Sequence, residues 1–265
     1  MKIKARITSI IKANSLDFSI TGFPTFDLSE LDLENDLEFL LPTNLRLGHL
    51  IERVVAELIK SSTNYKMLYE NIQIIEDKRT IGEIDFIIQN ENTKQCIHLE
   101  LAYKFYLFDP SISLEPINNW IGPNRNDSLL DKLQKLKAKQ FPLLYYRCTA
   151  SKFNTIAIEQ VAQALCLLVS LFVPFKYKGS FNPIYQKAIK GYYINVDTFI
   201  SLNSAAKWYY IPLKKEWGID PSENEIWTDI TGIAKDVTES IKEKQSLLCW
   251  QKYRNLYSEF FIVWW

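Results

Sequence analysis

Several residue types and patterns that mark particular protein classes are scarce in this sequence. Its 265 residues include only 8 Gly and 10 Pro, and 47% are hydrophobic, which excludes disordered, collagen-like and low-complexity proteins. Lys plus Arg equals Asp plus Glu at 31 each, so there is no bulk excess of positive charge to attract a polyanion. The composition predicts a globular protein with a substantial core, in which any contact with nucleic acid uses a local patch.

Cysteine pairs and membrane-spanning runs are also missing. No two of the four cysteines form a C-x-x-C pair, so we expect buried free thiols in a reducing compartment. The longest apolar run, residues 164–175, is interrupted by Ser170 and Pro174 and falls short of the ~20 residues that span a bilayer. The N-terminal residues lack the apolar stretch of a secretory signal. These features predict a cytoplasmic protein without a membrane segment.

Hydrophobic patterning divides the chain into three predicted parts. Residues 1–43 carry an acidic stretch between two prolines and are expected to form a loosely packed lead-in. Residues 44–175 are predicted to form the core domain, and residues 176–265 an aromatic-rich α+β extension packed on it. Aromatic residues at strand spacing in this extension are interpreted as core residues rather than as surfaces that stack on bases. They are Tyr192, Tyr193, Trp208, Tyr209 and Tyr210.

The predicted core domain has the element order α-β-β-β-α-β. Apolar residues at three- and four-residue spacing predict a helix over residues 47–59. Runs rich in Ile, Phe, Tyr and Leu, separated by short breaks, then predict an antiparallel meander of three strands. These strands are expected over residues 69–77, 81–89 and 95–108. After a second helix, we expect a fourth strand over residues 143–148 and a helix-like segment near residues 155–171.

Two strands of the predicted meander place acidic residues on one face. Glu83 and Asp85 are two positions apart in one strand, so their carboxylates point to the same side. The next strand places His98, Glu100, Ala102 and Lys104 on one face. If the two faces coincide, Asp85 and Glu100 are neighbours, and a hard cation such as Mg²⁺ would relieve their repulsion. The alternative for a strand acid is a solvated face or a salt bridge.

These residues resemble the PD-(D/E)XK, or restriction-endonuclease-like, superfamily of metal-dependent nucleases. The resemblance rests on Glu52 in the first helix, Gly82-Glu83-Ile84-Asp85 on one strand and Glu100 on the next. The longer motifs GEIDFII, HLELAYKFYL and W-x-GPN are similar to those of an uncharacterised bacterial family assigned to this superfamily. The similarity covers residues 44–145 well and the C-terminal part more loosely.

The resemblance implies a fold, a metal and a set of site residues. The implied fold is α/β, with a restriction-endonuclease-like α-β-β-β-α-β core around a mixed central sheet. The implied cofactor is Mg²⁺ or Mn²⁺, bound by Asp85, Glu100 and Glu83. The implied catalytic residues are Glu52, Asp85, Glu100 and Lys104.

The lysine of the superfamily motif is displaced in this sequence. Two residues after Glu100, where the superfamily has lysine, this chain has Ala102. Lys104 lies on the same strand face, about 13 Å from Glu100 along an extended chain. Lys132, on the following helix, is a second candidate. Either the lysine has moved, or the attacking water is handled differently, or catalysis has been lost.

Three further polar residues each have two interpretations. Glu52 is either a third carboxylate of the metal site or an ordinary residue at the boundary of an amphipathic helix. Gln140 is either a site residue on the second helix or part of a frayed helix end before Pro142. His98 can serve as a ligand or base, but a structural hydrogen bond is the more common role of a histidine in a strand.

A local surface for phosphate groups is predicted around the second helix. Lys132 belongs to a lysine-rich segment that is mostly a solvated face, but with Arg125 it can supply a phosphate-binding strip. The preceding loop exposes hydrogen-bond donors after a Gly-Pro turn, so it can line a cleft beside the metal, cap the helix, or do both. The predicted substrate-binding residues are Asn124, Arg125, Lys132 and Gln140.

The sequence supports one principal hypothesis for function and two alternatives. The principal hypothesis is a Mg²⁺-dependent nuclease, in which Asp85 and Glu100 bind the metal and Lys104 acts on the attacking water. The first alternative is a noncatalytic module that keeps the nuclease-like fold and binds nucleic acid or a protein partner. The balanced charge and the displaced lysine favour it. The second alternative is a structural protein whose acids pair with lysines.

Overall fold

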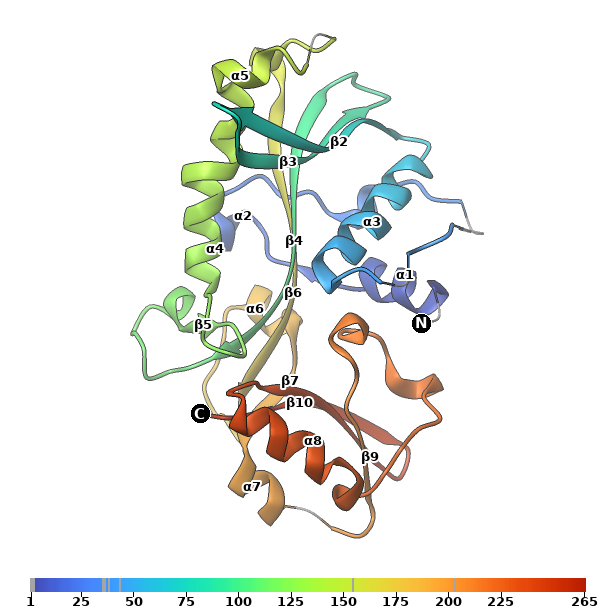
Figure 1. The fold of residues 1–265 in the computed structure, drawn as a ribbon, viewed down its shortest axis with the longest axis vertical. Coiled ribbons are helices and arrows are strands. Elements are labelled where there is room, and N and C mark those ends of the chain that lie inside the picture. The colour runs from blue at the N-terminus through green and yellow to red at the C-terminus, as the bar shows by residue number, and fades with distance from the viewer. Residues whose placement is uncertain (1–2, 35–36, 38, 43, 154, 203) are drawn as a thin grey trace. The chain divides into compact units, whose positions relative to one another are not determined.

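The computed structural model describes residues 3–34, 37, 39–42, 44–153, 155–202 and 204–265, which form a mixed α/β fold (Figure 1). These residues include eight α-helices and ten strands, with both parallel and antiparallel pairs, which confirms the predicted α/β class with a mixed sheet. The chain divides into two units, each built from several segments. Unit 1 comprises Met1–Ser9, Lys104–Leu130 and Val169–Trp265, and unit 2 comprises Ile10–Tyr103 and Asp131–Leu168. No helix in the described ranges is long and apolar enough to cross a membrane.

Helix α3 (Leu47–Lys60) of unit 2 forms where the apolar spacing predicts a helix. Its apolar residues recur every three or four positions, so they form one stripe that is buried. The buried residues are Leu50, Ile51, Val54, Val55, Ala56, Leu58 and Ile59. Glu52 lies at the edge of this stripe, with 26% of its side chain exposed. The helix ends at Ser61, whose backbone N–H donates to the carbonyl oxygens of Glu57 and Ile59.

Strands β2 (Tyr65–Glu76), β3 (Arg79–Asn90) and β4 (Cys96–Phe108) form the predicted antiparallel meander. The part of β4 up to Tyr103 belongs to unit 2. Asp77 and Lys78 join β2 to β3 with φ angles of 46° and 63°. A tight two-residue hairpin favours such left-handed conformations, because they match the twist of the strands that it joins. The meander therefore follows from short-range signals in the sequence.

Two predicted elements after the second helix are wrong. Residues 143–148, predicted as a strand, instead lie in a 3₁₀-helix (Phe141–Tyr145) and the short helix α5 (Arg147–Ala150). The helix-like segment expected near residues 155–171 is instead mainly strand β6 (Ala162–Pro174). Residues 164–172 of β6 are all buried, so its apolar run lacks the alternation that distinguishes a half-exposed strand from a helix.

Leu143 and Leu144 show why the 3₁₀-helix replaces a strand. Both consecutive side chains are buried in one cluster with Ile74 and Ile84, whereas neighbouring residues of a strand point to opposite faces. Gly82 allows this close packing, since a Cβ atom there would clash with a methyl carbon of Leu143.

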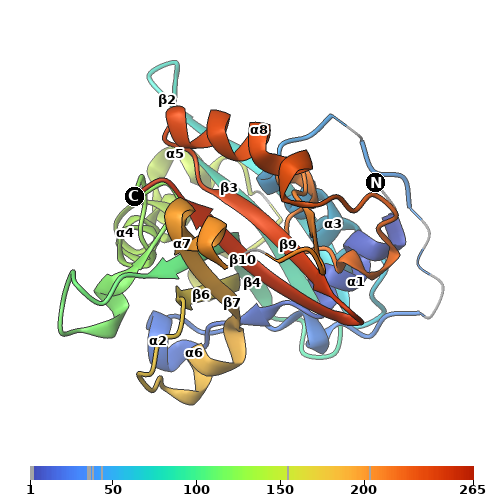
Figure 2. The ribbon, with the colours of Figure 1, turned by 90° about the horizontal axis from the view of Figure 1, so that it is seen from below.

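Helix α4 (Leu129–Lys135) forms as predicted and continues as a π-helix (Leu136–Gln140). Figure 1 shows α4 and α3 on opposite sides of β3, and Figure 2 shows the same order from below. The π-helix carries the chain directly into the 3₁₀-helix that packs on β2 and β3.

The N-terminal segment is packed more closely than the expected loose lead-in. It contains helices α1 (Ile3–Ile11) and α2 (Phe18–Thr21) and strand β1 (Asn14–Ser15), which pairs with β6. In unit 2, the backbone N–H groups of Leu16 and Phe26 donate to the carbonyl oxygens of Leu167 and Leu165. Both side chains are buried, so this stretch contributes to the core.

The strands of unit 1 pair in both parallel and antiparallel directions. In sheet order, its strands are the second part of β6, then β7 (Ile189–Asn195), β10 (Leu256–Val263), β9 (Leu247–Tyr253) and β8 (Lys207–Tyr210). Strand β7 runs parallel to both β6 and β10, and the remaining neighbours are antiparallel. The short strand β5 (Trp120–Ile121) pairs with the end of β4.

Helices α7 (Val196–Ser201) and α8 (Ile230–Lys242) cover one face of this sheet and share its apolar cluster, while the short helix α6 (Pro183–Ala188) precedes β7 (Figure 2). Tyr209 is 1% exposed, which confirms its predicted core position. The same prediction is wrong for Trp208, which is 49% exposed. Alternate residues of the edge strand β8 face opposite sides, so only one of the two reaches the cluster.

Candidate active site

Asp85 and Glu100 lie on neighbouring strands of unit 2, at the point where the hydrogen-bonded pairing of β3 and β4 begins. The first paired residues are Phe86 and Leu99, so the two acids occupy the adjoining position on a shared face of the strands. The Asp85 carboxylate oxygen Oδ2 accepts a hydrogen bond of 2.8 Å from the backbone N–H of Leu101. The Asp85 side chain thus takes the place of a backbone carbonyl as the acceptor for the N–H of Leu101, and this bond fixes Asp85 against β4.

The carboxylate of Glu100 is buried and is held through both of its oxygens. Its side chain has an exposed fraction of 1%. His98 Nε2 lies 2.9 Å from Oε1, and Gln140 Nε2 donates to Oε2 at 3.1 Å. Gln140 also donates to the backbone carbonyl of Glu83 at 3.3 Å. These partners compensate the buried carboxylate and orient it relative to β3.

Gln163 extends this network and was not found from the sequence. Its Nε2 atom donates to the carbonyl oxygen of Phe141 at 2.8 Å and lies 3.5 Å from His98 Nδ1. The ring of Phe141 packs edge-on against the imidazole of His98, with 5.4 Å between the ring centroids. The available signal was a polar residue immediately before the apolar run that begins at residue 164. Because that run was interpreted as a helix, the direction of Gln163 was not predictable.

The electrostatics of Asp85 reflect several charges in one place. Burial raises the pKa of its carboxyl well above the usual range, and the charge of Glu100 raises the pKa further. The N–H of Leu101 lowers it, Glu52 raises it, and Lys132 lowers it. Two other acids therefore act on Asp85 in the same direction, and the Lys132 ammonium acts against them.

The predicted site residues of unit 2 differ in their surroundings. Glu52 binds His49 at 3.0 Å and acts on Asp85 through its charge. Glu83 presents its backbone carbonyl to Gln140. In the described ranges there is no group of three or more His, Cys, Asp or Glu side chains placed to hold a metal ion. We take the acid pair Asp85 and Glu100 as the centre of the candidate site, because Gln140 contacts Glu100 and the charges of Glu52 and Lys132 act on Asp85.

The other predicted site residues lie in unit 1, where each contacts a residue of that unit. Lys104 Nζ lies 2.6 Å from Asp127 Oδ2. Arg125 Nη1 lies 3.0 Å from Asp109 Oδ2. Asn124 hydrogen-bonds the side chain of Gln245 and the backbone N–H of Ser246. These contacts tie Lys104 and the loop that follows β5 to other residues of unit 1.

A comparison with family models matches residues 18–255 to the family described as Domain of unknown function (DUF1853). The chain belongs to this family. The match spans both strands of the acid pair, helix α3 and the segment that carries Lys132 and Gln140. DUF1853 membership is consistent with the uncharacterised family that the sequence motifs resemble. Searches of curated proteins and of solved structures found no match.

Proposed function

We propose that this protein is a metal-dependent nuclease, and that Asp85 and Glu100 bind its divalent cation. The observation that carries this proposal is the convergence of two acids from neighbouring strands, one of them fully buried and oriented by His98 and Gln140. A purely structural role for Glu100 would be met by its contacts with these two partners. It would not explain why Asp85 is placed beside a second carboxylate, where each charge makes the other less favourable.

The donor set of the acid pair fits a Mg²⁺ or Mn²⁺ ion. Carboxylate oxygens are hard ligands, and each carboxylate oxygen has two lone pairs, so the hydrogen bonds to Asp85 and Glu100 leave further acceptor capacity. A bound cation would favour the ionised form of Asp85, so binding is expected to release a proton from a carboxyl with a raised pKa. When bound, the metal supplies Lewis-acid stabilisation of the charge on phosphoryl oxygens.

The residues around the acid pair have separate roles in this proposal. His98 and Gln140 hold Glu100 in one orientation, and the N–H of Leu101 holds Asp85. The Lys132 ammonium stabilises negative charge on the substrate beside Asp85. We assign this role to Lys132 instead of Lys104, because the charge of Lys132 acts on Asp85, whereas Lys104 pairs with Asp127.

The lysines provide the first test of this arrangement. Lys132→Met is expected to reduce metal-dependent cleavage by about a hundredfold, the usual effect of removing one charge-stabilising donor, while metal affinity is retained. Lys104→Met removes a half-exposed ion pair that is worth up to about 1 kcal/mol of stability, so cleavage should stay within about threefold of the unaltered protein. Initial cleavage rates of both variants decide between the lysines, and a larger loss in Lys104→Met would reverse the assignment.

The second candidate function is a noncatalytic module with the same architecture. The specific observation in its favour is Ala102, which takes the position of the superfamily's lysine and is 6% exposed, within the core. Under this alternative the acid pair keeps a structural or metal-binding role, and the protein binds nucleic acid or a protein partner without cleaving it.

A cleavage assay separates the two candidates. The protein is incubated with mixed single-stranded and double-stranded DNA and RNA, in Mg²⁺ or Mn²⁺ and in EDTA, and metal affinity is measured in parallel by calorimetry. We expect metal-dependent cleavage that Glu100→Gln reduces by at least about a hundredfold, since it removes one of two charged ligands. The matched control is Glu76→Gln, which alters an exposed acid on β2. Metal binding without cleavage would favour the noncatalytic module, and no metal binding would refute the proposed site.

A further inference from the structure

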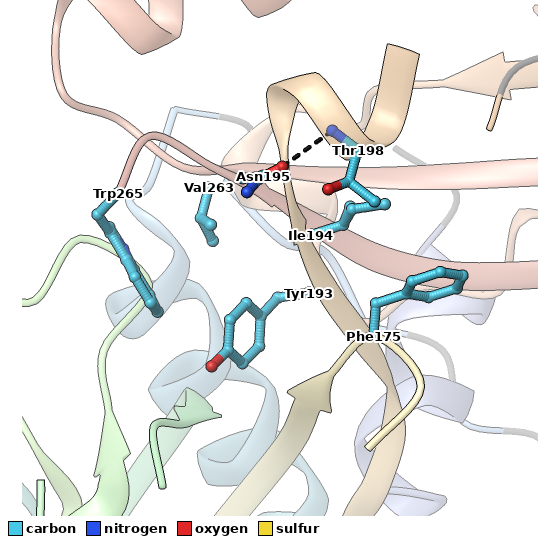
Figure 3. A pocket seen from close by; sticks show the side chains of 7 residues that line it. All are labelled: Phe175, Tyr193, Ile194, Asn195, Thr198, Val263 and Trp265. Atoms are coloured by element: carbon cyan, nitrogen blue, oxygen red, sulfur yellow. Dashed lines mark hydrogen bonds between the residues drawn. The ribbon is translucent and has the colours of Figure 1, made fainter. Parts of the chain in front are cut away.

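Unit 1 contains a pocket of about 250 Å³ at the end of β7, where the chain enters α7 (Figure 3). Three aromatic rings surround it, those of Phe175, Tyr193 and Trp265, and Asn195 and Thr198 line the side next to α7. All three rings are partly exposed. Their faces are therefore accessible to a ligand, unlike the ring of Tyr209 in the core of this unit.

The two rings nearest the end of β10 are held in place at their polar edges. The hydroxyl of Tyr193 donates to the carbonyl oxygen of Phe108 at 2.9 Å. The indole N–H of Trp265 donates to the carbonyl oxygen of Pro123 at 3.1 Å. Their ring centroids are 5.2 Å apart, with an angle of 49° between the planes. Since the polar atoms of both rings are already bonded within unit 1, the rings offer a ligand mainly fixed aromatic surface.

Asn195 adds a polar group next to the rings. Its Oδ1 atom caps α7 by accepting a hydrogen bond of 2.9 Å from the N–H of Thr198. This bond fixes the side-chain amide, and Figure 3 shows its nitrogen turned away from Thr198. A fixed amide donor beside aromatic rings suits a planar ligand that carries acceptor atoms on its edge, as a nucleobase does.

Two cations flank the aromatic surfaces. The exposed Lys176 has its Nζ atom 5.3 Å from the ring centroid of Phe175, and no ion pair with it occurs in the described ranges. The guanidinium of Arg125 lies 4.6 Å from the ring centroid of Trp265 and also binds Asp109. Lys176 is thus available to a negatively charged group on a ligand whose ring occupies the pocket.

We propose that this pocket binds one nucleobase that carries a phosphate, with the base on Tyr193 and Trp265 and the phosphate near Lys176. The aromatic surfaces supply stacking, which tolerates every base because every base has a π face. The amide of Asn195 reads the edge of the base, and Lys176 adds charge attraction. This inference goes beyond the proposed cleavage and does not depend on it. The base can belong to a free nucleotide or to a single strand.

Calorimetric titration of the full chain in EDTA tests the proposal without any contribution from cleavage. The ligands are AMP, a single-stranded DNA 8-mer and ribose 5-phosphate, which lacks the base. We expect AMP or the 8-mer to bind at least about tenfold more tightly than ribose 5-phosphate, which corresponds to the stacking of one base. Tighter binding of the 8-mer identifies a strand as the source of the base, and equal binding identifies a free nucleotide.

Three variants locate the binding. Trp265→Leu should weaken binding by about tenfold, because it removes one stacking surface. Asn195→Asp retains the helix cap but replaces the amide donor, and Lys176→Asn suits the left-handed backbone, with φ of 59°, while removing the charge. Both are expected to weaken binding severalfold without unfolding unit 1. The matched control is Trp208→Leu, which removes an exposed tryptophan elsewhere.

Any one of three results would overturn the pocket proposal. The first is that neither AMP nor the 8-mer binds, and the second is that ribose 5-phosphate binds with the same affinity as these ligands. The third is that Trp265→Leu and Lys176→Asn leave binding unaltered. Glu100→Gln should bind the base ligands like the unaltered protein. Loss of cleavage in that variant with retained base binding therefore separates the two proposals.

Discussion

Asp85→Asn is expected to stabilise the metal-free protein at neutral pH and to abolish the stabilisation that Mg²⁺ gives the unaltered chain. Burial and the charge of Glu100 raise the pKa of Asp85, so the folded protein holds this proton more tightly than the unfolded chain. The associated stability is complete below the unfolded pKa and is lost as the pH rises through the raised folded pKa. Asparagine does not ionise, and its side-chain oxygen still accepts the hydrogen bond from Leu101.

Urea unfolding between pH 5 and pH 8, in EDTA and in Mg²⁺, measures both effects. At an Mg²⁺ concentration of about 100 times Kd, the unaltered protein should gain about 2.7 kcal/mol in free energy of unfolding, and Asp85→Asn almost none. In EDTA the variant should be the more stable protein, with a growing advantage as the pH rises. Glu76→Gln is the control for general charge effects. Equal stabilisation of all three proteins by Mg²⁺ would contradict the assignment of the ion to the acid pair.

The part of the fold that was predictable rests on local signals. Helix α3 shows a clear stripe of apolar residues, and the strands of the meander are separated by short polar turns. The strand parity of Asp85 and Glu100 also follows from the sequence, since the turn between β3 and β4 sets a register that places both acids on one face. The same local reasoning therefore found the centre of the candidate site.

The parts that were not predictable depend on burial and on distant partners. Strand β6 is buried on both faces, so its residues show no alternation, and the consecutive buried residues Leu143 and Leu144 look like a strand for the same reason. The position of Gln163 in the network of Glu100 required β6 to be recognised as a strand. The partner of Lys104 is Asp127, 23 residues later, and no local pattern specifies that ion pair.

Glu259→Gln is expected to remove about 3 kcal/mol of the loss of stability that the unaltered protein shows between pH 5.5 and pH 8, and to leave the part that Asp85 causes. Glu259 lies on β10, where it pairs with Gly191 and Trp250, and is 7% exposed. Its Oε1 atom has no hydrogen-bond partner among the described residues. Burial raises the pKa of its carboxyl to about 8, although Lys190 lowers the pKa and Asp220 raises it. The folded protein therefore favours the neutral acid, which the amide of glutamine mimics in shape.

The sign and size of this effect follow from proton linkage. The folded pKa of about 8 lies above the ordinary value of 4.5, so the stability associated with the proton is complete below 4.5 and is lost as the pH rises to 8. The loss is roughly 1.4 kcal/mol per pH unit, or about 3 kcal/mol between pH 5.5 and pH 8. Glu259→Gln should show a pH slope in urea unfolding that is smaller by this amount, whereas Glu225→Gln, which alters an exposed acid of unit 1, should keep the full slope. Identical pH slopes for all three proteins would contradict this prediction. They would mean that Glu259 has the same pKa in the folded and unfolded states.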